Sequence, residues 1–248
     1  MNTFRAELHV HTVLSPWADI EMTPPLIVQE ASSRGINIIA ITDHNSSANI
    51  TAVQKAAQGS GIFIIPGMEL QTKEEVHVLC LFDNLEQIEA LQRDVSKRMA
   101  RIENQPDHYG EQFVVDEAGN YIRRESQLLI SSADISIQKA CEIVHNLGGL
   151  FIPAHVNRSA FGLIENLGFV PSQLKVDALE ISRHISVEKV LLQFPRLKNY
   201  PIIQNGDVHR LDNLLGFVEF HIESPTIEEI KKAFQGVNER FFKILSIR

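Results

Sequence analysis

The chain has 248 residues and a formal net charge of −8, because 23 Lys and Arg residues face 31 Asp and Glu residues. Hydrophobic residues make up 44% of it, which excludes a disordered chain, and the length allows one α/β barrel or two small domains. The acidic balance, without a run rich in Lys and Arg, argues against a protein that grips long nucleic acid. With two cysteines and no long apolar run, we expect a cytoplasmic protein without disulfides and without a membrane partner.

Strand and helix patterns alternate along the first part of the chain. A short strand is expected at 8–10, followed by a helix from Pro24 to Ser33 that Thr23 caps and Gly35 ends. The apolar, β-branched run 36–42 is typical of a strand covered on both faces. The pattern then predicts a helix near 50–58, strands at 62–66 and 76–82, and a long charged helix at 85–104.

The segment 106–129 interrupts this alternation. Residues 113–123, with Gly119 and Asn120 at the turn, predict a β-hairpin. We therefore expect a helical and hairpin insertion over about 85–129, on the rim of the fold. After it the alternation returns, with helices expected at 136–146 and 226–235 and strands at 150–153, 178–181, 202–204 and 217–222.

Repeated βα units predict a parallel sheet with right-handed crossovers. Seven or eight such units favour a closed barrel, in which residues that follow the strands gather at the C-terminal mouth. We therefore expect one α/β barrel domain over residues 1–248.

Histidines and carboxylates recur at the ends of the predicted strands. His9 and His11 are two residues apart, a spacing that places both rings on the same face of a strand, and Asp207 and His209 repeat it. Neutral imidazoles and carboxylates are the ligands that hold Zn²⁺, Mn²⁺ or Fe²⁺. The pattern therefore predicts a buried multi-metal site, built from His9-Val-His11, Thr42-Asp43-His44, Gly67-Met68-Glu69, Glu75-Val76-His77, Pro153-Ala154-His155 and Gly206-Asp207-Val208-His209.

In order and type, these motifs resemble those of the polymerase and histidinol phosphatase (PHP) family, from about residue 6 to about residue 245, with 85–129 the least typical region. The resemblance implies a distorted (β/α)7 TIM-like barrel with two or three divalent transition-metal ions (Zn, Mn or Fe) and phosphoesterase activity. By position, it implies a first metal held by His9, His11, Glu69 and Asp207, a second by Glu69, His77 and His155, and a third by His44 and His209.

One position departs from the family pattern. Family members usually carry a His or Asp ligand of the third metal around positions 16 to 17, where this chain has Pro16 and Trp17. Neither residue offers a useful ligand atom, so the third metal is expected to be weak, absent, or completed by water and substrate, unless Asp19 or Glu21 swings in. We expect Trp17 to pack, or to cover the substrate as a lid, rather than to take part in the chemistry.

The expected reaction is hydrolysis of a small phosphorylated metabolite or nucleotide by a metal-bound hydroxide. Glu69 is predicted to bridge two metals, and Asp43 to orient a histidine, or otherwise to act as a base. Arg158 is predicted to bind the phosphate, or otherwise to form a salt bridge at the rim. Arg183 and His184 are weaker candidates for substrate contact or proton donation, and Glu180 is expected to support the site.

Three other functions remain open. An amidohydrolase-like C–N hydrolase also begins with His-x-His, but the bridging residue here is Glu69 rather than a carboxylated lysine. A nuclease acting on short nucleic-acid ends fits the family, although the acidic balance disfavours long nucleic acid. A non-catalytic, metal-stabilised module is disfavoured by the near-complete ligand set. The sequence carries no signal for the oligomeric state.

Overall fold

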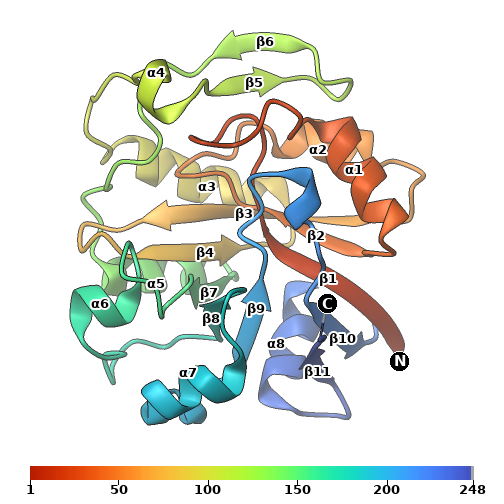
Figure 1. Ribbon diagram of the computed structural model, residues 1–248, viewed down its shortest axis with the longest axis vertical. Helices are drawn as coiled ribbons and strands as arrows, with labels where there is room; N and C mark the ends of the chain where they lie inside the picture. The colour runs from red at the N-terminus through yellow and green to blue at the C-terminus, as the bar shows by residue number, and fades with distance from the viewer. Residues whose placement is uncertain (247–248) are drawn as a thin grey trace.

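The computed structural model describes residues 1–246. Its centre is a curled seven-stranded sheet in the order β11-β10-β1-β2-β3-β4-β7 (Figure 1). The strands of this sheet are β1 (Asn2–Val10), β2 (Ile38–Ile41), β3 (Phe63–Gln71), β4 (His77–Leu81), β7 (Leu150–Pro153), β10 (Val218–Ile222) and β11 (Phe241–Ile244).

Two further strands, β8 (Leu179–Ser182) and β9 (Ile202–Asn205), form a separate parallel pair. On one side, single backbone hydrogen bonds join the β7 region to the β8 region, from Val156 N to Glu180 O and from Asp177 N to Phe151 O. On the other side, an isolated bridge links the end of β1 to the loop after β9. The strands therefore form a half-barrel that is completed by isolated contacts, which is the distorted barrel that the family resemblance implies rather than the closed barrel expected from the repeated βα pattern.

The sheet is mixed, and the expectation of a parallel sheet is corrected here. Only β1, β2 and β3 run parallel to one another, whereas the pairs β3–β4, β4–β7, β1–β10 and β10–β11 are antiparallel. Residues 72–76 alone connect β3 to β4, and so short a link cannot hold a crossover helix. The chain therefore returns as a hairpin, which places the end of β3 beside the start of β4.

The helices cover both apolar surfaces of the strands. α1 (Pro24–Ser33), α2 (Ile50–Ala56), α3 (Leu85–Ser96) and α5 (Ile137–Asn146) contribute to the larger buried apolar cluster, and α8 (Ile227–Gln235) packs with β10 in the second cluster. Shorter helices are α4 (Pro106–Tyr109), α6 (Leu163–Leu167) and α7 (Val187–Gln193), with 3-10 turns at Pro195–Asn199 and Leu211–Asn213. Among the described residues, no helix is both long and apolar enough to span a membrane.

The long helix expected over 85–104 is shorter than predicted. α3 ends at Ser96, and the chain beyond it pairs instead with residues that follow the hairpin, through the bridges Met99–Ala133 and Glu103–Gln127. The predicted hairpin is present as β5 (Phe113–Val115) and β6 (Tyr121–Arg124), which Figure 1 shows at the top of the molecule. Hydrogen bonds from Phe113 N to Val13 O and from Trp17 N to Tyr109 O attach the insertion to the loop after β1.

Candidate metal centre

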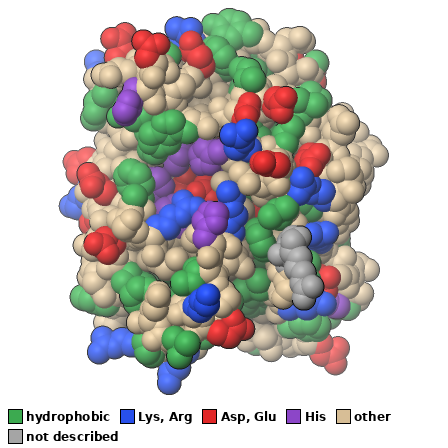
Figure 2. Space-filling view, viewed as in Figure 1, with side chains coloured by type: hydrophobic (Ala, Val, Ile, Leu, Met, Phe, Trp, Pro, Cys, Tyr) green, Lys and Arg blue, Asp and Glu red, His purple; other side chains and the backbone are tan. Residues whose placement is uncertain are grey.

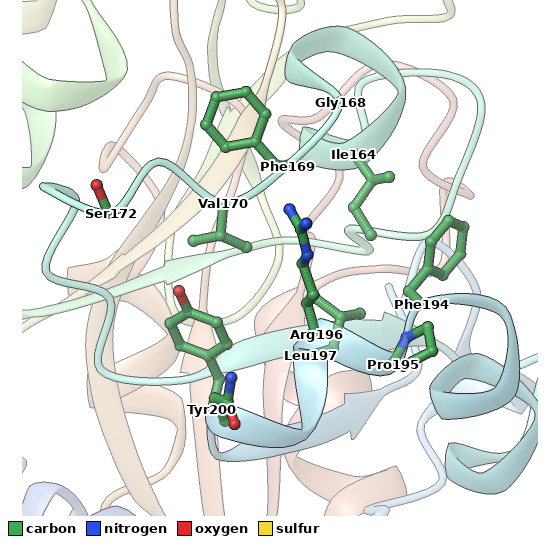
Figure 3. A pocket seen from close by; sticks show the side chains of 11 residues that line it. Ile164, Gly168, Phe169, Val170, Ser172, Phe194, Pro195, Arg196, Leu197 and Tyr200 are labelled. Atoms are coloured by element: carbon green, nitrogen blue, oxygen red, sulfur yellow. The ribbon is translucent and has the colours of Figure 1, made fainter.

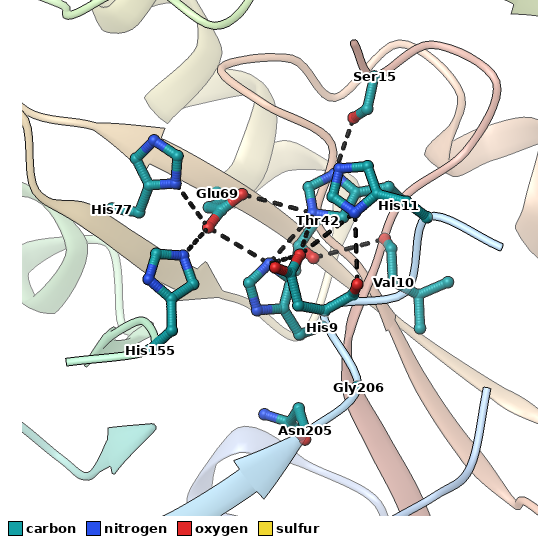
Figure 4. Close-up of polar contacts among 12 residues, drawn as sticks. His9, Val10, His11, Ser15, Thr42, Glu69, His77, His155, Asn205 and Gly206 are labelled. Carbon is teal, nitrogen blue, oxygen red and sulfur yellow. Dashed lines mark hydrogen bonds and ion pairs between the residues drawn. The ribbon is translucent and has the colours of Figure 1, made fainter. Parts of the chain in front are cut away.

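Five imidazoles surround the buried carboxylate of Glu69, which stands on β3 where that strand passes the end of β2. A parallel bridge between His44 and Glu69 continues the pairing of β2 and β3 to this point. Glu69 is therefore the hub of the site, as Figure 4 shows. Its Oε1 lies 2.9 Å from His77 Nδ1, 3.1 Å from His155 Nε2 and 3.3 Å from His9 Nε2, and its Oε2 lies 2.9 Å from His44 Nδ1 and 3.4 Å from His11 Nε2.

The pair from β1 meets the loop after β9. The Nε2 atoms of His9 and His11 lie 3.1 Å apart, and both are 3.4 Å from Asp207 Oδ1. β1 changes register between Glu7 and Val10, and such bulges bend a strand and redirect its side chains. Together with Glu69, these three residues form a group whose ligand atoms all lie within 4.8 Å of one another, the same four residues predicted for the first metal.

Two further groups of possible ligands share His44. One contains His44, Glu69 and His77, and the other contains His11, His44 and His209, each within the same 4.8 Å limit. His155, predicted with Glu69 and His77, contacts Glu69 Oε1 without joining either group. The structure thus brings all eight predicted ligands to one place, with His44 between the second and third groups.

The substitutes considered for the missing third-site ligand lie elsewhere. The Asp19 carboxylate pairs with Arg210 at 3.7 Å, and Glu21 is exposed. Within the described residues, neither belongs to a ligand group. The third group is therefore made of imidazoles alone.

The donor atoms fit a divalent transition metal. His44 Nδ1 and Glu69 Oε2 are buried 2.9 Å apart, yet neither has a hydrogen-bond partner within residues 1–246. A buried polar atom without a partner costs about 1–3 kcal/mol. A cation between the two would satisfy both, and nitrogen with carboxylate oxygen is the donor set of Zn²⁺, Mn²⁺ and Fe²⁺.

Burial favours the neutral, metal-binding form of three of the histidine rings. It lowers the pKa of His44 to about 3 and also lowers the pKa of His77 and of His209, so these imidazoles are neutral. Burial alone would raise the pKa of Glu69, but His77 and the other nearby imidazoles outweigh it and hold that pKa well below its usual range. Neutral imidazole and ionised carboxylate are the forms that metal ions bind.

The first histidine pair behaves differently. Burial would lower the pKa of His9 and of His11, but neighbouring carboxylates outweigh it and raise both. For His9 the largest of these opposing effects comes from Glu180, whose Oε2 lies 3.0 Å from His9 Nδ1. Glu180 also accepts hydrogen bonds from the Asn205 side chain and from the backbone N–H of His155. It therefore links one ligand from β1 to another that follows β7.

Glu7 is a functional neighbour that the sequence analysis missed. Its buried carboxylate accepts hydrogen bonds from the backbone N–H groups of Gly206 and Gly216, and burial raises its pKa to about 8. It thereby fixes the loop that carries Asp207. The available signal was a glutamate between the apolar strand residues Ala6 and Leu8, which is unusual unless the carboxylate has partners.

Asp43 lies behind the ligands rather than among them. Its buried carboxylate accepts hydrogen bonds from Thr12 N, Thr12 Oγ1 and Ser15 Oγ, at 2.7, 2.8 and 2.7 Å. Burial raises its pKa. Ser15, which the sequence analysis did not single out, connects Asp43 to the Nδ1 atom of His11 at 2.8 Å.

Two arginines stand at the edge of the cluster. The half-buried guanidinium of Arg158 donates to Asp207 Oδ2, and that of Arg183 donates to the carbonyl of Gly206. Figure 2 shows histidine and acidic side chains on the floor of a hollow, with basic side chains beside them. His155 and Asp207 both have positive φ, at 30° and 48°, a conformation that non-glycine residues adopt rarely and mostly at functional positions.

Two other predicted residues lie away from the cluster. His184 is exposed and lines a different pocket with Ile244 and Leu245, and within the described residues no hydrogen bond or ion pair joins its ring to a predicted ligand. Trp17 is half exposed; its Nε1 donates to the carbonyl of His108 at 3.1 Å and its ring packs on Tyr109. The indole therefore packs on the insertion.

The curled α/β half-barrel and the buried histidines around a shared glutamate are the features of a protein that binds several metal ions at one site. The family model described as "PHP domain" matches residues 7–153, which is more than half of the chain. The chain belongs to this family, which comprises metal-dependent phosphoesterases. His155, Asp207 and His209 lie outside the matched range, and the geometry of the structure places these three predicted residues beside the others.

Comparison with individual proteins agrees on the fold. The chain is 22% identical to Uncharacterized protein YqxK of Bacillus subtilis, over 97% of this chain and 64% of that protein, and 26% identical to a 5'-3' exoribonuclease of Haemophilus influenzae, over 62% and 69%. The crystal structure of the lesion-specific endonuclease PfuEndoQ from Pyrococcus furiosus superposes with a TM-score of 0.76 at 20% identity, covering 97% of this chain and 58% of that one. The chain thus spans about three fifths of the length of YqxK and of PfuEndoQ.

Proposed function

We propose that this protein hydrolyses the phosphoester of a small phosphorylated metabolite or nucleotide at the eight-residue centre. The observation that carries this proposal is the contact between Arg158 and Asp207, because it places a guanidinium beside the group of four ligands. Guanidinium groups bind phosphate oxygens through two parallel hydrogen bonds. Divalent metals at the ligands would supply a nucleophile at neutral pH and stabilise charge on the phosphate.

The residues of the chain divide this work. Glu69 contacts five of the seven other predicted ligands, all except Asp207 and His209, so it is the candidate bridge between metals. Arg158 orients the phosphate at the mouth, and Arg183 holds the backbone of the loop that carries Asp207. Asp43 is a positioning residue in this proposal rather than a base, since its carboxylate is already engaged by three donors. A cytoplasmic location and a single domain stay predictions of the sequence.

The test combines metal analysis with a substrate panel. The protein is loaded separately with Mn²⁺, Zn²⁺ and Fe²⁺ and assayed on p-nitrophenyl phosphate, bis-p-nitrophenyl phosphate, mononucleotides and p-nitroanilide amides. We expect two or more bound metal equivalents and hydrolysis of phosphoesters only. Hydrolysis of amides would instead support the amidohydrolase alternative, and metal binding without turnover would support a non-catalytic module.

Arg158 offers a sharper version of this test. Arg158→Ala should lower kcat/KM by roughly 10–100-fold, about the loss of one charge-assisted contact to phosphate, while metal content is unchanged. Arg98→Ala is the matched control, because Arg98 is an exposed arginine paired with Asp94 on the outer surface. Equal kcat/KM values for the two variants would show that Arg158 does not bind the phosphate.

The second candidate function is a nuclease, because two of the similar proteins are named as nucleases. A 5'-3' exoribonuclease and a lesion-specific endonuclease both match this chain over more than half of its length. The net charge of −8 still favours short ends over long duplexes. Comparing kcat/KM on a mononucleotide, a short single strand and a duplex separates these candidates, since a nuclease should prefer one of the two polymers.

A further inference from the structure

The hydroxyl of Ser15 lies at the junction of three groups behind the metal centre. Its Oγ is 2.8 Å from His11 Nδ1, 2.7 Å from Asp43 Oδ1 and 3.2 Å from the backbone nitrogen of His44. All four residues are buried, so water does not compete for these bonds. A hydroxyl has one proton to donate and two lone pairs to accept with, so the direction of each bond can be assigned.

Contacts with the neighbouring Thr12 show that both carboxylate oxygens of Asp43 act as hydrogen-bond acceptors. Thr12 Oγ1 accepts from Leu14 N at 3.2 Å and from Asn49 Nδ2 at 2.9 Å, so both of its lone pairs are used. Its own proton must therefore point to Asp43 Oδ2, 2.8 Å away. Asp43 Oδ1 accepts the backbone N–H of Thr12 at 2.7 Å. Both oxygens of Asp43 therefore accept hydrogen bonds, and Ser15 Oγ donates to Oδ1 at 2.7 Å.

Ser15 consequently gives its proton to Asp43 and accepts at its two lone pairs. One lone pair takes the N–H of His44, and the other takes a proton that must sit on His11 Nδ1. The opposite nitrogen, Nε2, is then the ring atom left for a metal ion, and it lies 3.4 Å from both Glu69 Oε2 and Asp207 Oδ1. We propose that Ser15, held by Asp43, is a positioning residue that fixes His11 as the Nδ1–H tautomer and aims its Nε2 at the metal centre.

The two histidines of the His9-Val-His11 motif are therefore positioned by different residues. Glu180 contacts His9 Nδ1 directly, whereas Asp43 acts on His11 through a serine. Removal of Ser15 should thus disturb His11 and leave the ring of His9 in place. This inference rests on the proposed function, because it takes His11 to be a metal ligand.

The experiment reads the tautomer directly. In protein labelled with ¹⁵N at histidine and loaded with Zn²⁺, NMR should show His11 protonated at Nδ1 and metal-bound at Nε2. Ser15→Ala should remove the protected Nδ1–H signal and weaken Zn²⁺ binding by about 10-fold or more in competition with a chelator, the usual effect of losing a partner of a metal ligand. Ser15→Thr retains a hydroxyl and should restore both. Ser131→Ala, which removes another buried hydroxyl bonded only to the Leu128 carbonyl, should change neither.

Three results would overturn the inference. Wild-type His11 protonated at Nε2 refutes it, and this reading needs no variant and holds even if Ser15→Ala does not fold. Unchanged Zn²⁺ affinity and an unchanged Nδ1–H signal in folded Ser15→Ala also refute it while leaving the proposed function intact. Wild-type protein that binds none of Zn²⁺, Mn²⁺ and Fe²⁺ refutes both the inference and the proposed function.

Discussion

The two ends of the metal centre are built differently. At the inner end, Glu69, His77 and His155 are almost fully buried and come from β3, β4 and the end of β7. At the outer end, the His209 side chain is 20% exposed and lies on the loop after β9, with its ring 3.9 Å from that of His11. The inner end is built around the buried Glu69 carboxylate, whereas the outer group consists of three imidazoles. The Asp207 carboxylate lies beside that outer group, with its Oδ1 3.3 Å from His209 Nδ1. The comparison indicates a strong inner site and a weak outer one.

Loss of the shared carboxylate should have the largest effect. Glu69→Gln keeps the shape of the side chain but removes the charge that faces five imidazoles, so most of the metal and nearly all of the activity should be lost. The loss of affinity should exceed the roughly 10–100-fold typical of residues that only support a ligand. Elemental analysis measures the loss of bound metal, and kcat on the best phosphoester substrate measures the loss of activity.

A surface glutamate provides the control for this variant. Glu89 lies at an exposed position of α3, so the Glu89→Gln variant should retain full metal content and activity. A Glu69→Gln protein with wild-type metal content would show that the carboxylate does not bridge, and the contrast between the two ends would have no basis.

Removal of the outer ligand should have a smaller effect. His209→Ala should lower the affinity for the last metal equivalent by about 10-fold or more and leave the others bound, because only the outer group depends on this ring. Stepwise Zn²⁺ titration by calorimetry separates the equivalents. Simultaneous loss of every equivalent would mean that the two ends bind metal as one unit.

His145, a histidine outside the metal centre, has a pKa that is shifted in the opposite direction to that of the buried ring of His44. His145 Nε2 lies 2.8 Å from Asp177 Oδ2, and this hydrogen bond raises the pKa of His145 to about 9, whereas burial lowers that of His44 to about 3. The pKa of His145 is higher in the folded protein than the value of about 6.5 in the unfolded chain. The ion pair with Asp177 therefore adds its full contribution to the free energy of unfolding below about pH 6.5, and this contribution is lost as the pH rises towards 9. We expect a loss of roughly 1–3 kcal/mol.

Urea unfolding of metal-free protein at pH 6 and pH 9.5 measures this loss. His145→Gln should lack it, so the difference in pH dependence between wild type and variant isolates the pair from other titrating groups such as Glu7. Parallel pH dependences in the two proteins would show that Asp177 does not hold His145 in its charged form.

The local elements of this protein follow from its sequence more directly than their arrangement does. The helix Pro24–Ser33 and the strand Leu150–Pro153 have the predicted bounds, because proline, glycine and apolar runs act locally. The direction of β4 was missed although the short link 72–76 indicated it, since an apolar run has no direction of its own. The strand β11 at the edge of the sheet was not predicted, because its apolar run is only four residues long and is interrupted by Lys243.

The same division applies to the site. Histidine, glutamate and aspartate at strand ends predicted the eight residues that the structure brings together, because the chemistry resides in the residue type. Ser15 and Glu7 were not predicted because their importance comes from partners far away in the sequence, such as Asp43 and Gly216. Supporting residues of this kind become visible only when the fold places their partners beside them.

The smallest expected effect tests the outer end once more. Trp17→His introduces an imidazole where family members usually carry a ligand, yet the present side chain is 52% exposed and is directed to His108 and Tyr109 on the insertion. We therefore expect unchanged metal content by elemental analysis and a change in unfolding free energy within about 1 kcal/mol, from lost packing on the rim. A gain of one bound equivalent would mean that the loop after His11 reaches the centre, and that the outer end is weak only because its ligand is missing.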